Sequence, residues 1–344
     1  MSEHFWAGMA IILASGVFNG GFALPMKYSR RWQWENTWLV FTSVSLVIVP
    51  WALAVGFVPR LAEVYRGAAS SALAYALVFG FLWGIAQVTF GLGIKMVGIA
   101  LTFAVVSGLA SLSGSLVPIL VFAPSDLFRP RGLLLLLSIP LLLVGLALYA
   151  LAGRWREKEQ ASGSPGTRQR RAEGGIAAGL AICVFTGIFG ANFNLGFVFG
   201  SDILRSSQEQ GASPLASTYA VWALVLGAGF FPNLIYCGYR LFRNRTWPLF
   251  FGERFAREGA LGIAMGLLWV TGILSYGIGA TWVGRYGTSI GFMLFIAASI
   301  LSANVFGILA GEWKATSSKT RQFLFAALAF IVGAVVVLNL GGLF

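Results

Sequence analysis

The sequence predicts an all-α integral membrane protein in which ten transmembrane helices form two inverted five-helix repeats. Of the 344 residues, 58% are hydrophobic and only 10% are charged, whereas a soluble domain carries roughly 25% charged residues. Ten apolar runs reach the length of about 20 residues that a helix needs to cross a bilayer. The pattern of one run also recurs in the second half of the chain, which is typical of transporters built from internal repeats.

The ten runs follow one another along the chain with short polar loops between them. They cover residues 5–25, 37–57, 72–94, 100–122, 131–152, 175–200, 214–239, 260–282, 288–311 and 322–341. Tryptophans gather near the run ends, as expected of aromatic belts at the two membrane surfaces. The polar segment 153–174 predicts a flexible cytoplasmic linker. It divides the chain into a first repeat, 1–152, and a second repeat, 175–344.

The third run carries the clearest sign of the repeat. On a helix its small and polar residues share one face, which suits a closely packed neighbour or a wet cavity better than lipid. In the stretch 80–98, which begins in this run, six residues recur 186 positions later, with Gly80, Trp83, Gly91, Gly93, Val97 and Gly98 matched by Gly266, Trp269, Gly277, Gly279, Val283 and Gly284. Weaker matches join three other pairs of runs. Because each half has five runs, the second half must enter the membrane from the opposite side, which predicts an inverted repeat.

The basic residues predict the orientation. Six of the 24 lysines and arginines fall on the side that holds the N-terminus and eighteen on the other side. Cytoplasmic loops carry such an excess, so we expect the second side to be cytoplasmic and both termini to lie outside. The N-terminus lacks a basic region and a cleavage site, which favours a retained helix over a signal peptide. Since the charges lie in short loops, the net charge of +12 does not indicate a nucleic-acid partner.

The residues of the runs argue against an enzyme. The single histidine, His4, precedes the first run, so an intramembrane Ser–His pair is excluded. The chain has no HExxH motif and no aspartate at the centre of a run, which leaves no pattern for a metal or aspartyl protease. Cys183 and Cys237 fall inside runs and are expected to be small core residues. We therefore predict no catalytic residue, no metal site and no cofactor.

Neutral polar residues inside the runs predict a hydrogen-bonding cavity. Buried amides and hydroxyls are costly without partners, and a neutral sugar would supply hydroxyls together with an apolar ring face for an aromatic side chain. The alternative is that the amides join helices and the tryptophans pack against neighbours. The candidate substrate-binding residues come from the first, third, sixth and eighth runs and are Asn19, Trp83, Gln87, Asn192, Trp269 and Tyr276.

The acids lie at helix ends or in loops, and Glu35 is the most suggestive of them. At the start of the second run it could offset the helix dipole and pair with Arg30 or Arg31. Alternatively, it is the proton-coupling site, which takes up a proton when the cytoplasmic mouth closes and dries.

Two further residues are expected to hold or gate the helices. Glu312 ends the ninth run, where its charge has the wrong sign for the helix dipole. It is expected to act as a structural clamp with a partner such as Lys314 or Arg321. Gly84, on the polar face of the third run, is expected to permit a tight helix contact that can slide.

Three stretches, LPMKYSRRWQWENTW, GFLWGIAQVTFGLGIKMVGIAL and GEWK, resemble the bacterial L-rhamnose–proton symporter family of the drug/metabolite transporter superfamily. The resemblance covers nearly the whole chain. It implies ten helices with both termini outside and inward transport of a 6-deoxyhexose driven by the proton gradient. The first stretch contains Lys27, expected to have a structural or gating role, and Glu35, which the resemblance favours as coupling residue. Residues 285–289 read RYGTS, whereas family members carry a Tyr-Asp-Tyr-like patch in this region.

The sequence therefore predicts a secondary active transporter that takes up L-rhamnose or a related 6-deoxyhexose with a proton by alternating access. Its predicted partners are a small neutral sugar, the proton and the lipid bilayer. One alternative is an exporter of another small metabolite or drug in the same superfamily. The alternative from a different class is a membrane scaffold that transports nothing.

Overall fold

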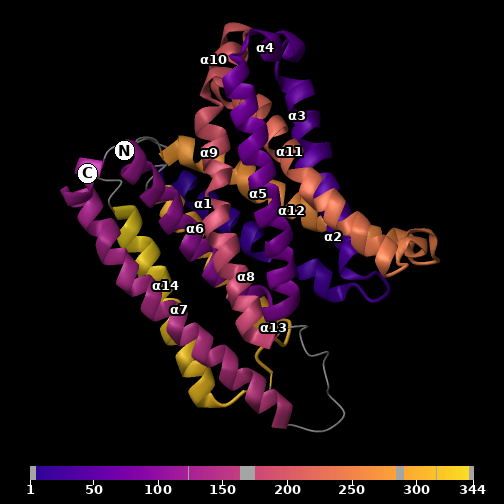
Figure 1. The fold of residues 1–344 in the computed structure, drawn as a ribbon, viewed down its shortest axis with the longest axis vertical. Helices are drawn as coiled ribbons and strands as arrows, with labels where there is room; N and C mark the ends of the chain where they lie inside the picture. The colour runs from indigo at the N-terminus through magenta and orange to yellow at the C-terminus, as the bar shows by residue number, and fades with distance from the viewer. Residues whose placement is uncertain (1–4, 123, 163–174, 284–289, 315, 341–344) are drawn as a thin grey trace. The chain divides into compact units, whose positions relative to one another are not determined.

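A computed structural model describes residues 5–122, 124–162, 175–283, 290–314 and 316–340, and every regular element in these ranges is a helix (Figure 1). The α-helices are α1 Phe5–Gly21, α2 Trp34–Thr42, α3 Val49–Phe57, α4 Leu61–Gly67, α5 Ser70–Val97, α6 Ile99–Phe122, α7 Pro130–Ser162, α8 Gly175–Gly190, α9 Asn192–Phe199, α10 Ser201–Glu209, α11 Pro214–Arg243, α12 Phe255–Val283, α13 Ile290–Leu309 and α14 Ser318–Leu340. Shorter helices are η1 Leu24–Tyr28, η2 Ser43–Ile48, η3 Pro124–Phe128 and η4 Trp247–Phe251. The predicted all-α class is confirmed.

Each of the ten predicted runs contains helix within its described residues. Among the described residues, eight helical segments are long and apolar enough to cross a membrane: Phe5–Tyr28, Trp34–Phe57, Ser70–Val97, Gly132–Arg156, Gly175–Glu209, Pro214–Arg243, Phe255–Ala280 and Ser318–Leu338. Two more apolar helical stretches, Ile99–Ser113 and Leu294–Leu309, are shorter. The chain is therefore an integral membrane protein by the length and composition of its helices.

The chain forms two compact units. The first unit consists of Met1–Leu24, Thr89–Ile188 and Thr271–Phe344, and the second consists of Pro25–Val88 and Phe189–Val270. Each unit thus takes segments from both sequence halves, so neither unit coincides with a predicted repeat.

In the first unit, α7 and α14 lie side by side (Figure 1), and α1 packs along α13. Glycines allow two of the helix contacts to be very close. A Cβ atom added to Gly16 of α1 would lie 2.4 Å from the Cβ of Ala298 on α13. One added to Gly187 of α8 would lie 2.5 Å from the Cβ of Leu109 on α6. Small residues at such points let helix backbones approach closely. In a membrane, helices associate through such packing because lipid tails are as apolar as the side chains they would replace.

Helix α7 is longer than the predicted fifth run and continues to Ser162. Its last residues, GRWREKEQAS, include the good helix formers Arg, Glu, Lys and Gln. Glu159 accepts hydrogen bonds from the backbone N (2.8 Å) and Oγ (2.6 Å) of Ser317 and from Oγ1 of Thr320 (2.8 Å), at the start of α14. The first ten residues of the predicted linker 153–174 are therefore helical, and 163–174 lie outside the described residues.

In the second unit, the predicted second run is helical from Trp34 to Phe57 but contains the π turn η2. Pro50 follows this turn. Proline has no N–H to donate, and its ring clashes with the carbonyl of residue i−4 in a regular helix. A π turn gives the extra room, and the N–H of Val49 accordingly bonds to the carbonyl of Val44, five residues earlier.

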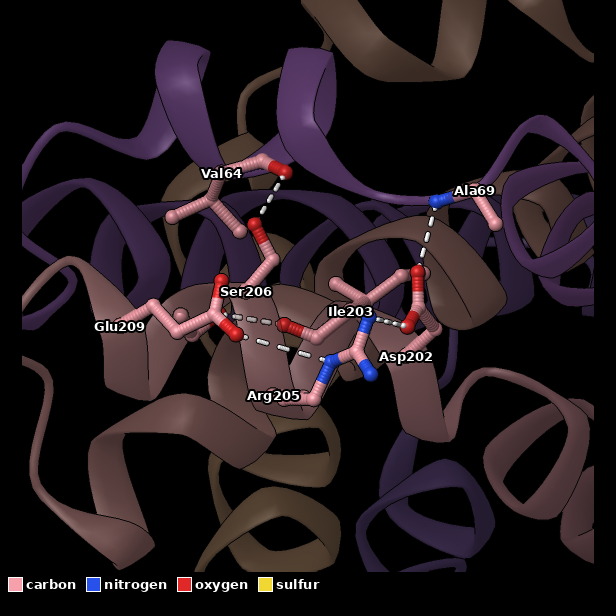
Figure 2. A network of polar contacts seen from close by, with 8 residues as sticks. Val64, Ala69, Asp202, Ile203, Arg205, Ser206 and Glu209 are labelled. Atoms are coloured by element: carbon pink, nitrogen blue, oxygen red, sulfur yellow. Dashed lines mark hydrogen bonds and ion pairs between the residues drawn. The ribbon is translucent and has the colours of Figure 1, made fainter.

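Two short helices of the second unit, α4 and α10, were not predicted. Figure 2 shows how they meet: Oγ of Ser206 donates to the carbonyl of Val64 (2.9 Å), and the backbone N of Ala69 donates to Oδ2 of Asp202 (2.7 Å). Arg205 pairs with Asp202 (2.8 Å) on the exposed side. Ile203 is fully buried and anchors α10 in an apolar core. The polar sequence SDILRSSQE, with few apolar residues, had indicated a loop.

Candidate substrate and proton sites

A row of aromatic rings runs through the second unit. The indole rings of Trp83 on α5 and Trp269 on α12 stack at 6.1 Å between centroids, with 29° between their planes. Trp83 also meets Phe193 of α9 (5.0 Å), and Phe193 stacks on Trp222 of α11 (4.5 Å). Trp83 and Trp269 are both 7% exposed. Two predicted residues, Trp83 and Trp269, are thus in contact, while Phe193 and Trp222 were not predicted.

Gln87 lies one helical turn after Trp83 and is 7% exposed. Its Nε2 is a buried donor without a hydrogen-bond partner among the described residues. Leaving such a donor unpaired costs about 1–3 kcal/mol, so buried donors are nearly always satisfied by protein, water or a ligand. Gln87 therefore offers a free donor beside the aromatic row.

Gly84, between these two residues in the sequence, is a contact point for α11. A Cβ atom added to Gly84 would lie 2.3 Å from the carbonyl oxygen of Gly229. Nδ2 of Asn233 donates to the carbonyls of Gly229 (2.9 Å) and Gly84 (3.3 Å), and its Oδ1 accepts from Nε1 of Trp38 (2.9 Å). Asn233 thus joins α2, α5 and α11, as the alternative interpretation of the amides expected.

Asn192 lies where the predicted sixth run is broken. The run ends as α8 at Gly190 and resumes as α9 at Asn192. Nδ2 of Asn192 donates to the carbonyl of Phe189 (2.8 Å), a local bond of the kind by which asparagine competes with the helical backbone. Irregular backbone at membrane depth is tolerated where protein or a watery cavity surrounds it.

The remaining two substrate candidates lie in the first unit. Nδ2 of Asn19 donates to Oγ of Ser299 (3.0 Å), and the ring of Tyr276 packs on Phe295 (4.9 Å between centroids). The six predicted substrate residues are therefore divided between the two units, four in the second and two in the first.

Glu35 is buried at the first turn of α2, with 1% of its surface exposed. Its Oε1 accepts from Nδ2 of Asn244 (2.7 Å) and from Oγ1 of Thr246 (3.0 Å). Both donors are neutral, and neither predicted arginine, Arg30 or Arg31, forms an ion pair with it in the described part of the chain. A buried carboxylate held only by neutral donors is a candidate for proton exchange.

A second buried acid, Glu258, was missed by the sequence analysis. It is fully buried at the start of α12 and accepts from Oγ of Ser29 (2.6 Å) and the backbone N of Arg30 (3.3 Å). Nη1 of Arg257 lies 3.8 Å from its Oε1. Backbone N–H groups and a cation favour the charged carboxylate, so Glu258 suits a fixed anion that holds the segment after η1.

Glu312 lies at the N-terminus of α6. Its carboxylate accepts from the backbone N of Ile99 (2.8 Å) and of Ala100 (3.3 Å). A carboxylate is favourable there because the first N–H groups of a helix lack partners. These donors differ from the predicted partners, Lys314 or Arg321, and the clamp role stays a prediction. Lys27 is exposed in η1. The predicted departure at 285–289 lies outside the described residues.

These features define a multi-pass helical membrane protein with buried aromatic, amide and carboxylate groups, as secondary transporters have. A profile of the L-rhamnose-proton symport protein (RhaT) family matches residues 1–343. The chain therefore belongs to this family of transporters, which are not enzymes, and the predicted family is confirmed.

Individual relatives agree over nearly their full length. The chain is 24% identical over 351 residues to the L-rhamnose-proton symporter of Cronobacter sakazakii, covering 99% of each chain. It is 26% identical over 327 residues to that of Pectobacterium atrosepticum (93% of each chain) and 23% over 348 residues to that of Escherichia coli O1:K1 / APEC (99% of each). No solved structure matches the chain.

Proposed function

We propose that the protein takes up L-rhamnose or a closely related 6-deoxyhexose together with a proton across the bacterial inner membrane by alternating access. The observation that carries the proposal is the aromatic row beside the unpartnered donor of Gln87, in a chain of the symporter family. The proton gradient is the driving force, and no cofactor is required.

The sugar chemistry fits this cluster. A 6-deoxyhexose carries a methyl group and apolar ring C–H groups that pack on indole faces such as those of Trp83 and Trp269. Its hydroxyls accept hydrogen bonds, which is what Nε2 of Gln87 can donate. A buried donor that is satisfied only by substrate also discriminates strongly against analogues that lack the hydroxyl.

Ten spans in two inverted repeats are the architecture we propose, and matching glycine contacts support it. Gly16 approaches the carbonyl of Phe295 and the Cβ of Ala298. A shift of 171 residues takes Gly16 to Gly187, and a shift of 189 relates Phe295 and Ala298 to Val106 and Leu109, which are the residues that Gly187 approaches.

Backbone conformation supports the same repeat in the second unit. Arg60 and Arg245 are the two non-glycine residues with positive φ in the described chain, at 49° and 53°. They are 185 positions apart and follow the second and seventh runs. The borders of the two units after Ile188 and Val270 lie seven and four residues before the positions that shifts of 171 and 186 give for Leu24 and Val88. Five spans in each half then give inverted halves with both termini in the periplasm.

Proton coupling is assigned to Glu35. Its burial and neutral hydrogen-bond donors, Asn244 and Thr246, distinguish it from Glu258, which backbone N–H groups and Arg257 hold as an anion. Glu35 would bind the proton in one state of the transport cycle and release it in the other.

Right-side-out vesicles test the proposal. A proton gradient, inside alkaline, should concentrate labelled L-rhamnose inside, and a protonophore should abolish the accumulation. A panel of sugars in a thermal-unfolding assay separates the alternatives, because a bound substrate stabilises the protein by mass action. An exporter would extrude the label, and a scaffold would respond to no sugar; either result would refute the uptake function.

A further inference from the structure

The connector between α11 and α12 has a composition unlike that of the connector between α3 and α5. Residues 240–257 contain five arginines and one acid, Glu253. The connector also exposes large aromatic side chains: Phe242 is 87% exposed, Trp247 55%, Phe251 79% and Phe255 54%. Basic and aromatic residues side by side are typical of segments at the membrane surface.

The helix dipole explains only part of this charge. Arg240 and Arg243 lie in the last turn of α11, where cations are favourable. Arg254 and Arg257, however, lie at the start of α12, where a positive charge opposes the dipole. Arg257 is near Glu258 (3.8 Å), but Arg254 has no ion pair in the described part of the chain. Arg254 is therefore a cation at a helix start that no acid of the described residues pairs with.

Arg245 also has no acidic partner among the described residues. Its φ of 53° is in the left-handed region, which costs an arginine roughly 1 kcal/mol or more compared with glycine. Its counterpart Arg60 has the same conformation but pairs with Glu63, three residues later, at 3.7 Å. Three residues after Arg245 the chain has Pro248, and Arg245 forms no ion pair within the described ranges.

We propose that this connector binds the phosphate headgroup of an anionic phospholipid, with the arginines on the phosphate and the exposed aromatic side chains in the adjoining acyl region. Arg243, Arg245 and Arg254 supply the charge, and Arg243 is partly engaged already, since its Nη1 bonds the hydroxyl of Tyr239. Guanidinium groups bind phosphate oxygens in pairs and are weakly hydrated, which favours them at such sites.

The proposed lipid site lies next to the residues that hydrogen-bond Glu35. Arg243 and Arg245 flank Asn244, and Thr246 follows, so the lipid-binding turn contains both donors to Glu35. A bound headgroup would hold this turn in place. The binding itself does not depend on the proposed sugar uptake, so the two are tested separately.

Binding can be measured on the full-length protein in a neutral detergent by native mass spectrometry and thermal unfolding, with phosphatidylglycerol, phosphatidylcholine and inorganic phosphate as probes. One arginine near an anionic headgroup contributes about 1 kcal/mol, which is about fivefold in affinity. The double variant R245Q/R254Q should therefore bind phosphatidylglycerol about 25-fold more weakly. The matched double variant R60Q/R66Q, in the connector before α5, should bind it like the wild type.

Three results would overturn the proposal: equal weakening in both double variants, equal affinity for phosphatidylcholine, or equal stabilisation by inorganic phosphate, which would indicate a site for soluble anions. If R245Q/R254Q unfolds at a lower temperature than the wild type without lipid, the single variants R245Q and R254Q replace it. Each should lose about fivefold in affinity, and no loss in either would also refute the site.

Discussion

Glu35 and Glu258 are both buried carboxylates of the second unit, but different groups hold them. Side-chain amide and hydroxyl donors from Asn244 and Thr246 surround Glu35, and these groups can serve a protonated carboxyl as well as a charged one. Backbone N–H groups and Arg257 favour the charged form of Glu258. At the scale of single residues, this difference in partners is why we propose Glu35, and not Glu258, for proton coupling.

The first prediction concerns Glu35→Gln. The variant should exchange labelled sugar across the membrane but should not accumulate it in response to a proton gradient, because the amide binds no proton. Uptake and counterflow in vesicles measure the two activities. Glu253→Gln removes an exposed acid of the neighbouring connector and should leave both unchanged. Uphill uptake by Glu35→Gln would remove Glu35 from the coupling mechanism.

Gln87→Leu gives the second prediction. Because Nε2 of Gln87 has no partner in the described chain, its removal should leave the melting temperature unchanged or higher. The sugar affinity should fall about tenfold, the value of roughly one hydrogen bond of about 1.4 kcal/mol. Asn233→Leu, in contrast, removes three hydrogen bonds and should lower the melting temperature. A large loss of stability in Gln87→Leu would mean that the residue is structural.

Sequence reasoning identified Trp83, Gln87 and Trp269 because helical spacing and the internal repeat are local signals. It could not identify Glu258 as buried, since an acid in the first turn of a helix usually has a solvated capping role. Its burial depends on Ser29 and Arg30, more than two hundred positions away in the sequence, coming to lie against it. Contacts of that kind leave no trace in one sequence.

At the scale of elements, α5 and α11 pack closely where glycine leaves the backbone without a side chain, as at Gly84 and Gly229. In Gly84→Leu the new side chain would start 2.3 Å from the carbonyl of Gly229, so α5 and α11 must move apart. Overpacking of this kind costs about 1–3 kcal/mol, and transport should be lost while the protein remains in the membrane. Gly56→Leu is the control, because a Cβ at Gly56 meets nothing within 4 Å. Full transport by Gly84→Leu would contradict the packing role.

The hydrogen bonds of Glu159 on α7 with Ser317 and Thr320, at the start of α14, predict a pH effect on stability. Hydrogen bonds from the side chain and backbone of Ser317 and from Thr320 hold the pKa of the Glu159 carboxyl below its ordinary value of 4.5. A lowered pKa in the folded state stabilises the protein above pH 4.5, and the effect is lost as the pH falls through the folded-state value. Glu159→Gln should therefore melt earlier than the wild type at pH 7, with the difference shrinking below pH 4.5. A constant difference would contradict this role.

The sequence predicted the ten helical runs but not the interruptions within and between them. The apolar pattern continues through Ala191, so nothing in the hydropathy marks the break between α8 and α9. Helix α10 was taken for a loop because its polar residues outnumber its apolar ones, although the fully buried Ile203 fixes it to the core. Elements whose stability comes from tertiary packing are poorly encoded in local composition.

At the scale of the whole molecule, the compact units are not the halves of the sequence. The sequence predicts repeats on either side of the linker, and each compact unit contains segments from before and after it. Helices that are distant in sequence pack within one unit, as Gly16 of α1 does against α13.

The proposed inverted arrangement predicts on which side of the membrane the N-terminus and the central linker lie. Cys183 and Cys237 are both fully buried, so single cysteines can be introduced without background labelling. In Ser2→Cys an impermeant maleimide should react from the periplasmic side of intact cells. In Ser164→Cys, within the central linker, it should react only after the membrane is permeabilised. Labelling of both positions from the same side would require an architecture without inverted halves.

The left-handed backbone of Arg60 and Arg245 has a practical consequence for engineering. Glycine would relax each of these turns by roughly 1 kcal/mol, so directed evolution for heat resistance should readily replace Arg60. At Arg245 the same exchange should survive in neutral detergent and be rejected in cells, where native lipids surround the protein. Screens in detergent and in cells should therefore both select glycine at position 60, but only the screen in detergent should accept it at position 245.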